Sequence, residues 1–246
     1  MATLVMDTAT EVLAVAAGDD TGLLASSSSR VARGHSRLLQ PALQHVLRQS
    51  GIQIQDVNTI GVGVGPGSYT GVRLGVSTAK AMASVTGAAV VAVSTLKMMA
   101  EAAAPEFCSQ AFAVMPLLYA RRQRAFGALY EKQGRAWRTV VPDQVLPISE
   151  WMNHLSAHLQ HSESGVSAHA VHDFAERYGV LDLLESASFT GYTHIQTVAG
   201  GLGASLFRLA NSLQGQVYEG DSLHLLAPEY GLQVEAEVKL AERSRV

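Results

Sequence analysis

The spacing of apolar residues in the first fifty positions predicts a three-stranded meander followed by a helix. Short apolar runs at Thr3–Asp7 and Val12–Ala17, and a more polar run at Leu23–Ser29, are typical of strands. The next segment, His35–Ser50, carries its apolar residues at helical spacing, and Gly51 supplies a stop signal. The chain therefore opens with three strands that lead into one helix.

Strands and helices then alternate up to about residue 105. Thr59–Val64 and Ala88–Val93 have the short apolar pattern of buried strands, and Val72–Thr86 has the length and spacing of a helix. Ser94 is a typical N-cap for a further short helix. A hairpin followed by alternating helices and strands predicts one half of an α/β fold.

The second half of the chain has a less regular pattern. The predicted strands are Ala111–Met115, Arg124–Tyr130 and Ala136–Val141, and the predicted helices are Ser149–Leu159, Asp173–Glu185 and Val198–Leu213. We therefore expect two lobes: residues 1–108, a smaller second lobe over residues 109–221, and a C-terminal segment, residues 222–246, that returns to the first lobe.

Composition narrows the class of protein. Hydrophobic residues make up 48% of the 246 residues and charged residues only 16%, against a usual value of about 25% for charged residues. Part of the protein surface is therefore expected to be covered by something other than solvent. The net charge of −3 does not favour broad nucleic-acid binding. A single cysteine, no signal peptide and no long apolar tract lead us to expect a soluble cytoplasmic protein without a disulfide or zinc site.

A glycine-rich turn is the sharpest motif in the chain. Gly65, Gly67 and Gly71 lie between a predicted strand and a predicted helix, where glycine permits close backbone approach. Val72 follows in place of the lysine of a phosphate loop. A dinucleotide-dependent oxidoreductase is not favoured, because no acidic residue lies about 20 positions further on. A tight turn that packs a helix on a sheet is the simplest interpretation.

A second motif lies at the end of the first predicted strand. Asp7, Thr8 and Thr10 place a carboxylate and two hydroxyls at the mouth of a hairpin. Such groups contact phosphates and the water shell of magnesium in actin-like folds. An ordinary Asp-Thr turn is the structural alternative.

Four segments in order carry a resemblance to a known family: Asp7–Thr10, Arg33–Pro41, Gly65–Gly75 and Val93–Leu96. In sequence and spacing they resemble the TsaB family of threonylcarbamoyladenosine (t6A) tRNA-modification subunits, closely through residue 100 and loosely beyond. The resemblance implies an actin/Hsp70/sugar-kinase-like fold with a reduced second lobe. It implies vestigial nucleotide contacts at most, no cofactor or metal of its own, and ATP–Mg²⁺ only at the level of a complex.

The resemblance also implies a function and partners. The expected function is that of a non-catalytic scaffold for threonylcarbamoylation of N6 of adenosine 37 in ANN-decoding tRNAs. The expected partners are the catalytic paralogue TsaD and the ATPase TsaE, with a homodimer when the chain is alone and tRNA contact only through the complex. The alternative is an ATP-using enzyme of the sugar-kinase type.

The second lobe departs from the family pattern. Tyr119 and Arg124 stand where the family usually has acidic residues, and Gly231 interrupts a C-terminal motif. These departures indicate a diverged second lobe. They leave the motifs of the first lobe intact.

The predicted helix Val72–Thr86 carries only two charges and several small residues at helical spacing. A helix that faces water on one side normally carries more charge. The positions expected to meet another chain are His35, Leu39, Val72, Gly75, Val76, Ala79, Met82 and Ala83. Burial of the helix within its own lobe is the alternative.

Basic and imidazole side chains suggest weaker candidates in the second lobe. Arg121, Arg124 and Arg138 belong to a group of arginines that could touch tRNA phosphates or simply be strand-face charges. His154 and His158 are spaced for metal binding on a helix, although surface histidines without a metal are the commoner case.

Overall fold

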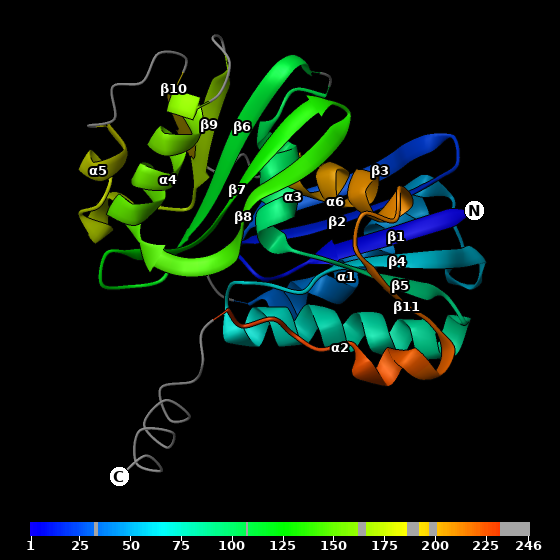
Figure 1. Ribbon diagram of the computed structural model, residues 1–246. Coiled ribbons are helices and arrows are strands. Elements are labelled where there is room, and N and C mark those ends of the chain that lie inside the picture. Colours follow the sequence, from blue (N-terminus) through cyan, green and yellow to red (C-terminus); the bar gives the residue numbers. More distant parts are fainter. Residues whose placement is uncertain (32–33, 107, 162–165, 186–191, 197–200, 232–246) are drawn as a thin grey trace.

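The computed structural model describes residues 1–31, 34–106, 108–161, 166–185, 192–196 and 201–231, arranged as two lobes (Figure 1). Each lobe contains one sheet covered by helices. The expected two-lobed α/β fold is confirmed. No helix in these ranges is long and apolar enough to cross a membrane.

The sheet of the first lobe has the strand order β11-β5-β4-β1-β2-β3. Its strands are β1 (Ala2–Asp7), β2 (Val12–Asp19), β3 (Gly22–Arg30), β4 (Val57–Gly63), β5 (Ala89–Val93) and β11 (Gln216–Tyr218). The β1–β2–β3 meander is antiparallel, whereas β1, β4 and β5 run parallel. Parallel strands bring the carboxyl ends of β1, β4 and β5 to one edge, where the first-lobe motifs lie.

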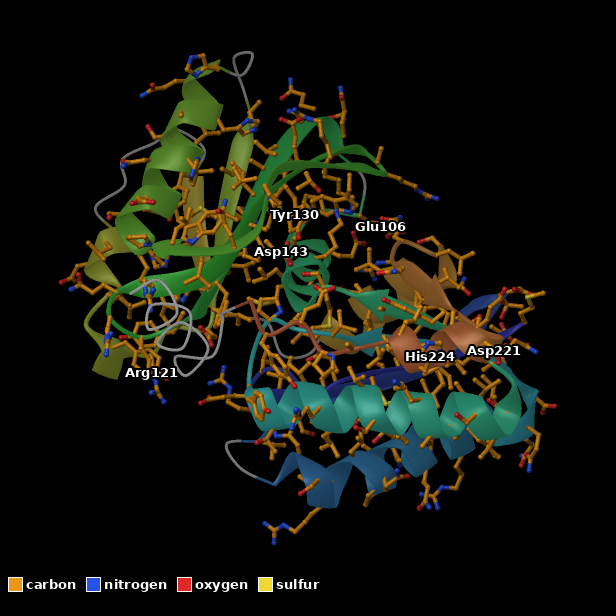
Figure 2. All side chains as sticks on the ribbon, turned by 60° about the horizontal axis from the view of Figure 1, so that its bottom comes forward. Glu106, Arg121, Tyr130, Asp143, Asp221 and His224 are labelled. Carbon is orange, nitrogen blue, oxygen red and sulfur yellow. The ribbon has the colours of Figure 1, made fainter. Side chains whose placement is uncertain are left out.

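Two pairs of helices cover the two faces of this sheet. On one face, α1 (His35–Ser50) and α2 (Tyr69–Thr86) lie side by side (Figures 1 and 2). On the other face, α3 (Thr95–Ala103) and α6 (Leu202–Asn211) pack together. Short 3₁₀ helices at Ile54–Asp56 and Gly220–Leu225 complete the lobe.

Local signals explain where these helices begin and end. Helix α1 ends at Gly51, which adopts a left-handed conformation with φ 72°. Ser68 caps α2 and accepts a hydrogen bond from the Gly71 N–H at 3.3 Å. Ser94 caps α3 and accepts from the N–H groups of Leu96 and Lys97 at 3.1 and 3.3 Å.

The sheet of the second lobe has the order β10-β9-β6-β7-β8. Its strands are β6 (Cys108–Tyr119), β7 (Arg124–Gly134), β8 (Ala136–Pro147), β9 (Ser167–His172) and β10 (Tyr192–Gln196). Helices α4 (Ile148–His161) and α5 (Asp182–Glu185) contribute to a core built around Trp151.

The second lobe ends earlier than residue 221, where the sequence placed its boundary. Helix α6 packs on β1, β2 and β4, and β11 pairs with β5, so the chain returns to the first lobe at about residue 202. Gly203 explains the close docking of α6, because a Cβ at that position would lie 3.0 Å from the Val15 carbonyl oxygen of β2. The expected return of residues 222–246 agrees with the placement of residues 222–231, and the remainder lies outside the described residues.

The expected helix over Asp173–Glu185 is also different in the structure. A 3₁₀ turn at Glu176–Tyr178 and the single turn α5 occupy this segment, with left-handed Gly179 between them. Glycine in that conformation separates the two turns. Within the expected helix over Val198–Leu213, α6 covers Leu202–Asn211, and residues 198–200 lie outside the described residues.

Candidate functional site between the lobes

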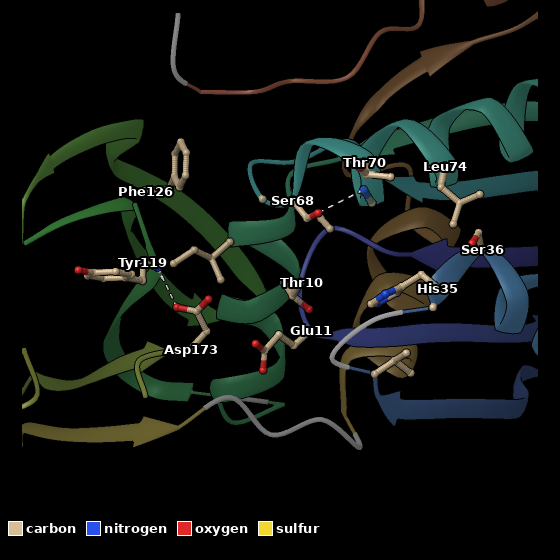
Figure 3. Close-up of a pocket in the computed structure, with 16 residues that line it drawn as sticks. Thr10, Glu11, His35, Ser36, Ser68, Thr70, Leu74, Tyr119, Phe126 and Asp173 are labelled. Atoms are coloured by element: carbon tan, nitrogen blue, oxygen red, sulfur yellow. Dashed lines mark hydrogen bonds between the residues drawn. The ribbon is translucent and has the colours of Figure 1, made fainter. Parts of the chain in front are cut away.

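A pocket of about 580 Å³ lies between the two lobes (Figure 3). From the first lobe it is lined by the β1–β2 turn and by the starts of α1 and α2. From the second lobe it is lined by the end of β6, by Phe126 of β7 and by Asp173, which follows β9. The carboxyl edge of the first sheet thus faces the second lobe across this pocket.

Asp7 ends β1 and is fully buried, and it is not part of the pocket lining. Its Oδ1 accepts a hydrogen bond from the Ala9 N–H at 3.0 Å, and its Oδ2 accepts one from the Thr95 hydroxyl at 3.0 Å. Gly63 on β4 leaves room for this arrangement, because a Cβ there would lie 1.7 Å from Asp7 Oδ2. Burial raises the pKa of Asp7 to about 6, although both hydrogen bonds lower it.

The glycine-rich turn seals the Asp7–Thr10 turn from the other side. The Thr8 hydroxyl donates to the Gly71 carbonyl oxygen at 2.6 Å, and the Ser68 N–H donates to the Ala9 carbonyl oxygen at 2.6 Å. A Cβ at Gly67 would lie 2.3 Å from the Ala9 carbonyl oxygen, and one at Gly71 would lie 2.0 Å from that of Thr8. Only glycine allows these backbones to approach so closely.

These contacts differ from the nucleotide role expected of the first-lobe motif. Asp7 and Thr8 are committed to buried internal hydrogen bonds, so neither faces a ligand in the pocket. Thr10 does line the pocket, but its hydroxyl accepts from the Val12 N–H at 3.0 Å within the turn. The motif holds the fold together here.

Two carboxyl groups, one from each lobe, line the pocket instead. Asp173 Oδ1 accepts a hydrogen bond from the Tyr119 N–H at 2.8 Å. Burial, with a smaller contribution from the charge of Glu11, raises the pKa of Asp173 to about 6, although hydrogen bonds from backbone N–H groups lower it. Glu11 belongs to the β1–β2 turn, so the two carboxyl groups come from opposite lobes.

Hydroxyl groups at the starts of α1 and α2 complete the polar lining. Ser36, Ser68 and Thr70 contribute them, and the described lining residues include no lysine or arginine. His35 at the start of α1 also lines the pocket, and burial lowers its pKa. Among the described residues, the lining of this pocket thus combines two carboxyl groups with several hydroxyl groups.

An aromatic stack occupies the place of the family's acidic motif in the second lobe. The Tyr119 ring stacks on Tyr178 with a centroid distance of 4.1 Å and meets Phe174 edge-on at 6.1 Å. Arg124 begins β7, and its carbonyl oxygen accepts from the Ala120 N–H at 2.9 Å to close the β6–β7 turn. Tyr119 and Arg124 therefore serve packing and turn geometry.

Gly231, which interrupts the C-terminal motif of the family, lies close to the second lobe. It has a φ of 65°, and a Cβ at this position would meet the Phe126 ring at 3.0 Å. Glycine at position 231 therefore avoids a close contact with Phe126, whose side chain lines the pocket.

The expected group of arginines is divided between the two ends of one hairpin system. Arg121 and Arg124 lie at the start of β7, while Arg135 and Arg138 lie beyond its far end. Arg138 forms an ion pair with Glu131 at 2.9 Å. These arginines do not form one continuous basic surface.

His158 contacts Glu131, with 2.9 Å between Nε2 and Oε2. Among the residues with described placement, no group of three or more His, Cys, Asp or Glu side chains could hold a metal ion.

The small residues of α2 face the first lobe's own sheet, which differs from the interface expected from the sequence. Six of the eight expected interface positions are buried in the described chain: Leu39, Val72, Gly75, Val76, Ala79 and Ala83. They pack with β1 and β4 residues such as Leu4 and Ile60. The small side chains bring α2 close to the sheet, as at Gly75, where a Cβ would lie 2.8 Å from Thr8 Oγ1. His35 and Met82 are half-buried.

Both charges of α2 are engaged by the C-terminal segment. Lys80 Nζ donates to the carbonyl oxygens of His224 and Leu226 at 3.1 and 3.0 Å, and Arg73 Nε donates to the Tyr230 hydroxyl at 2.6 Å. Figure 1 shows this segment passing along α2. The low charge of α2 thus reflects the sheet on one side and the C-terminal segment on another.

Together these features define a class: a two-lobed α/β protein in which a glycine-rich turn seals the β1–β2 turn and an acidic pocket separates the lobes. A family model described as "TsaD: tRNA N6-adenosine threonylcarbamoyltransferase" matches residues 27–230. The protein named tRNA threonylcarbamoyladenosine biosynthesis protein TsaB from Bacillus subtilis is 28% identical over 246 residues, covering 100% of both chains. Its namesake from Escherichia coli is 32% identical over 160 residues, covering 63% of this chain and 68% of its own.

A solved structure has the same fold as this chain. A crystal structure from Pseudomonas aeruginosa, described as similar to peptidase YeaZ, has a TM-score of 0.71 and 21% identity, covering 94% of this chain and 99% of its own. The chain belongs to the TsaB family.

The pocket contained residues that the sequence did not single out. Glu11 directly follows the Asp7–Thr10 motif, which was the one local signal that could have identified it. Asp173 had no such signal, because the strand that positions it, β9, was not predicted.

Proposed function

We propose that this chain is a non-catalytic scaffold subunit in the formation of t6A, the threonylcarbamoyl modification at N6 of adenosine 37 in ANN-decoding tRNAs. It acts in the cytoplasm with a TsaD-like catalytic paralogue and a TsaE-like ATPase. It forms a homodimer when alone, and tRNA reaches it only through the complex. Membership of the TsaB family supports the pathway, since relatives carry the name of t6A biosynthesis proteins.

The arrangement around Asp7 is the observation that carries the non-catalytic assignment. A phosphoryl-transfer enzyme needs carboxylates that hold Mg²⁺ against the phosphates in the cleft. Here Asp7 is buried against Thr95 and the Ala9 N–H, and the pocket is lined by the acidic Glu11 and Asp173. ATP–Mg²⁺ is therefore assigned to the complex and not to this subunit.

The outer face of α1 and α2 is the surface that we assign to the TsaD-like partner. It exposes large apolar side chains: Leu38 is 44% exposed, Tyr69 51% and Val85 88%. Exposed aromatic and aliphatic residues are typical of the centre of an interface. This surface replaces the buried positions expected from the sequence.

A binding experiment with a matched control tests the assignment. Val85→Glu and Val217→Glu each place a carboxylate on an exposed valine, the first on α2 and the second, 42% exposed, on edge strand β11. With a TsaD-like protein from the same cell, Val85→Glu should weaken association at least about tenfold, or about 1.4 kcal/mol. Val217→Glu should bind like the wild type. Equal binding of both folded variants would contradict the proposed surface.

The catalytic alternative is tested on the isolated chain. We expect negligible ATP hydrolysis and no t6A formation without the partners. Robust ATP turnover that Asp7→Ala abolishes would instead support an ATP-using enzyme of the sugar-kinase type.

A further inference from the structure

Arg73 belongs to a row of exposed residues along the outer face of α2. Positions four apart lie on one side of a helix, and five such positions in succession are exposed: Tyr69, Arg73, Ser77, Ala81 and Val85. The row follows the helix for about 24 Å, and Arg73 is its one charged member. Its two ends, Tyr69 and Val85, belong to the surface that we assigned to the TsaD-like partner.

Two tyrosines hold the guanidinium group of Arg73. Its Nε–H donates to the Tyr230 hydroxyl at 2.6 Å, and its Cζ lies 4.4 Å from the centroid of the Tyr69 ring. The Tyr69 and Tyr230 rings stack on each other with a centroid distance of 4.6 Å. The guanidinium is therefore fixed by an aromatic ring and a hydroxyl group, although the residue itself is exposed.

Tyr230 can orient Arg73 because the residues before it are anchored to the first lobe. Leu226 is buried in the same core as residues of α2. The Glu229 N–H donates to the Val64 carbonyl oxygen at 2.7 Å. Figure 1 shows this segment running along α2. The arginine is thus oriented by its own chain before any partner binds, which lowers the entropy cost of using it in an interface.

Most of the hydrogen-bonding capacity of Arg73 is unused within the described part of the chain. A guanidinium group presents its N–H donors as a planar fork. The Nε–H is the donor that meets an acceptor among the described residues, so the N–H groups of the two terminal nitrogens are left for another molecule. A fork of this kind matches the two oxygens of a carboxylate.

The position of Arg73 decides what a partner must supply. When a protein docks on this row, the guanidinium loses water, and a desolvated cation without an acceptor is strongly unfavourable. The Tyr69 ring and the exposed Val85 side chain fit a protein surface. RNA, by contrast, is held by several cations at once, and this row contains one.

We propose that Arg73 is the charged anchor of the partner surface and binds a carboxylate side chain of the TsaD-like protein through its terminal nitrogens. Tyr69 supports the guanidinium through its ring, and Tyr230 is a positioning residue that orients it. This inference rests on the proposed function, because it requires the partner to dock on the outer face of α1 and α2.

Calorimetric binding of the full chain to a TsaD-like protein from the same cell, without RNA, tests the anchor. Arg73→Gln should weaken association at least about tenfold. Arg73→Lys keeps the charge but lacks the fork, and should weaken it at least about threefold. Arg138→Gln is the control, because it removes an exposed arginine of the second lobe, and it should bind like the wild type. A folded Arg73→Gln protein that binds like the wild type would overturn the proposal.

Tyr230→Phe tests the positioning role separately. It keeps a ring that can stack on Tyr69 and removes only the hydroxyl that accepts from Arg73. We expect association to weaken about two- to fivefold, because the guanidinium must then be ordered on binding. In an Arg73→Gln background the same change should cost nothing further. Equal losses in both backgrounds would show that Tyr230 does not act through Arg73.

Carboxamide variants of the partner identify the acceptor. Each surface Asp or Glu of the TsaD-like protein is changed to Asn or Gln, and one variant should lose about as much affinity as Arg73→Gln. Combining that variant with Arg73→Gln should cost little more. If every partner variant is additive with Arg73→Gln, no carboxylate meets Arg73 and the proposal fails. If Arg73→Gln leaves partner binding intact and weakens tRNA binding by the complex, the arginine contacts phosphate, which also overturns it.

Val85→Glu separates failure of this inference from failure of the proposed function. Weak binding of Val85→Glu with normal binding of Arg73→Gln would keep the partner surface and reject the anchor. Normal binding of both variants, or no association of the wild type, would reject the surface and the anchor with it.

Discussion

The Thr95 hydroxyl donates a hydrogen bond of 3.0 Å to Asp7 Oδ2 in the interior of the first lobe. This bond joins the last residue of β1 to the first residue of α3. It turns the Asp7 carboxyl group toward the core, and the Ala9 N–H satisfies the other oxygen. Asp7, the acidic residue that first suggested a nucleotide site, therefore links β1 to α3 through a buried hydrogen bond.

Asp7→Asn should make stability less dependent on pH. The pKa of Asp7 rises from 3.8 to about 6 on folding, so the folded chain binds more protons than the unfolded chain between about pH 4 and 6. Stability from this group is therefore present at low pH and is lost as pH rises through 6. We compare the unfolding free energy of the variant with that of the wild type at each pH. Between pH 4 and pH 8 this difference should change by about 1–2 kcal/mol in favour of the variant.

Denaturant titrations of both proteins from pH 4 to 8 measure this effect. Asp173 has a raised pKa of the same kind, so the slope of stability against pH should become smaller in the variant and not vanish. Identical slopes for the two proteins would show that the Asp7 carboxyl group is not desolvated as described.

Gly67→Ala should destabilise the chain through backbone overlap. The new Cβ would lie 2.3 Å from the Ala9 carbonyl oxygen, and neither backbone can move without shifting the turns. We expect a loss of at least about 2 kcal/mol in chemical denaturation. Gly51→Ala is the matched control: it has a φ of 72° with no atom within 4 Å of the added Cβ, so only strain of about 1 kcal/mol is expected. Equal losses would mean that the Gly67 turn is not tightly packed.

The sequence predicted local structure well where one segment carries the whole signal. The helix His35–Ser50 has the predicted bounds, because its apolar spacing and Gly51 stop are both local. The three strands of the meander were also predicted, each one or two residues shorter than in the structure, and Ser94 caps α3 as expected. The sequence pattern could not predict which distant residues contact a helix. The charges of α2 are taken by His224, Leu226 and Tyr230, which lie about 150 positions further along the chain.

Ala79→Arg should unfold the isolated chain. Ala79 is fully buried between α2 and the sheet, where a guanidinium would find no partner. We expect a loss of about 3–5 kcal/mol, seen as loss of cooperative melting by circular dichroism. Ala81→Arg, on the exposed side of the same helix, should change stability by less than about 0.5 kcal/mol. A folded Ala79→Arg protein would restore the original view that this stripe meets another chain.

The pocket could be predicted only in part, for a similar reason. Its first-lobe side includes Thr10 and the start of α2, which the motifs marked. Its second-lobe side depends on Asp173, which is positioned by the pairing of β9 with β6 and by its bond to Tyr119. The proximity of Glu11 and Asp173 arises from how the lobes meet, and no periodic pattern in either segment encodes it.

Glu101→Ala should destabilise the seam between the lobes. Glu101 and Lys132 are 7% and 2% exposed, and Glu101 also accepts from Trp137 and Arg208. Removing the carboxylate leaves the Lys132 ammonium buried, and among the described residues its one remaining acceptor is the Pro105 carbonyl oxygen at 2.9 Å. We expect a loss of about 3–5 kcal/mol in urea denaturation.

The double variant Glu101→Leu with Lys132→Met distinguishes loss of pairing from loss of packing. It removes both buried charges and keeps apolar volume at both positions, so it should be more stable than Glu101→Ala by about 2 kcal/mol or more. If Glu101→Ala costs less than about 1 kcal/mol, Lys132 must reach water when its partner is lost. If the double variant is no more stable than Glu101→Ala, the cost comes from packing between α3 and β7, and the buried charge of Lys132 contributes little.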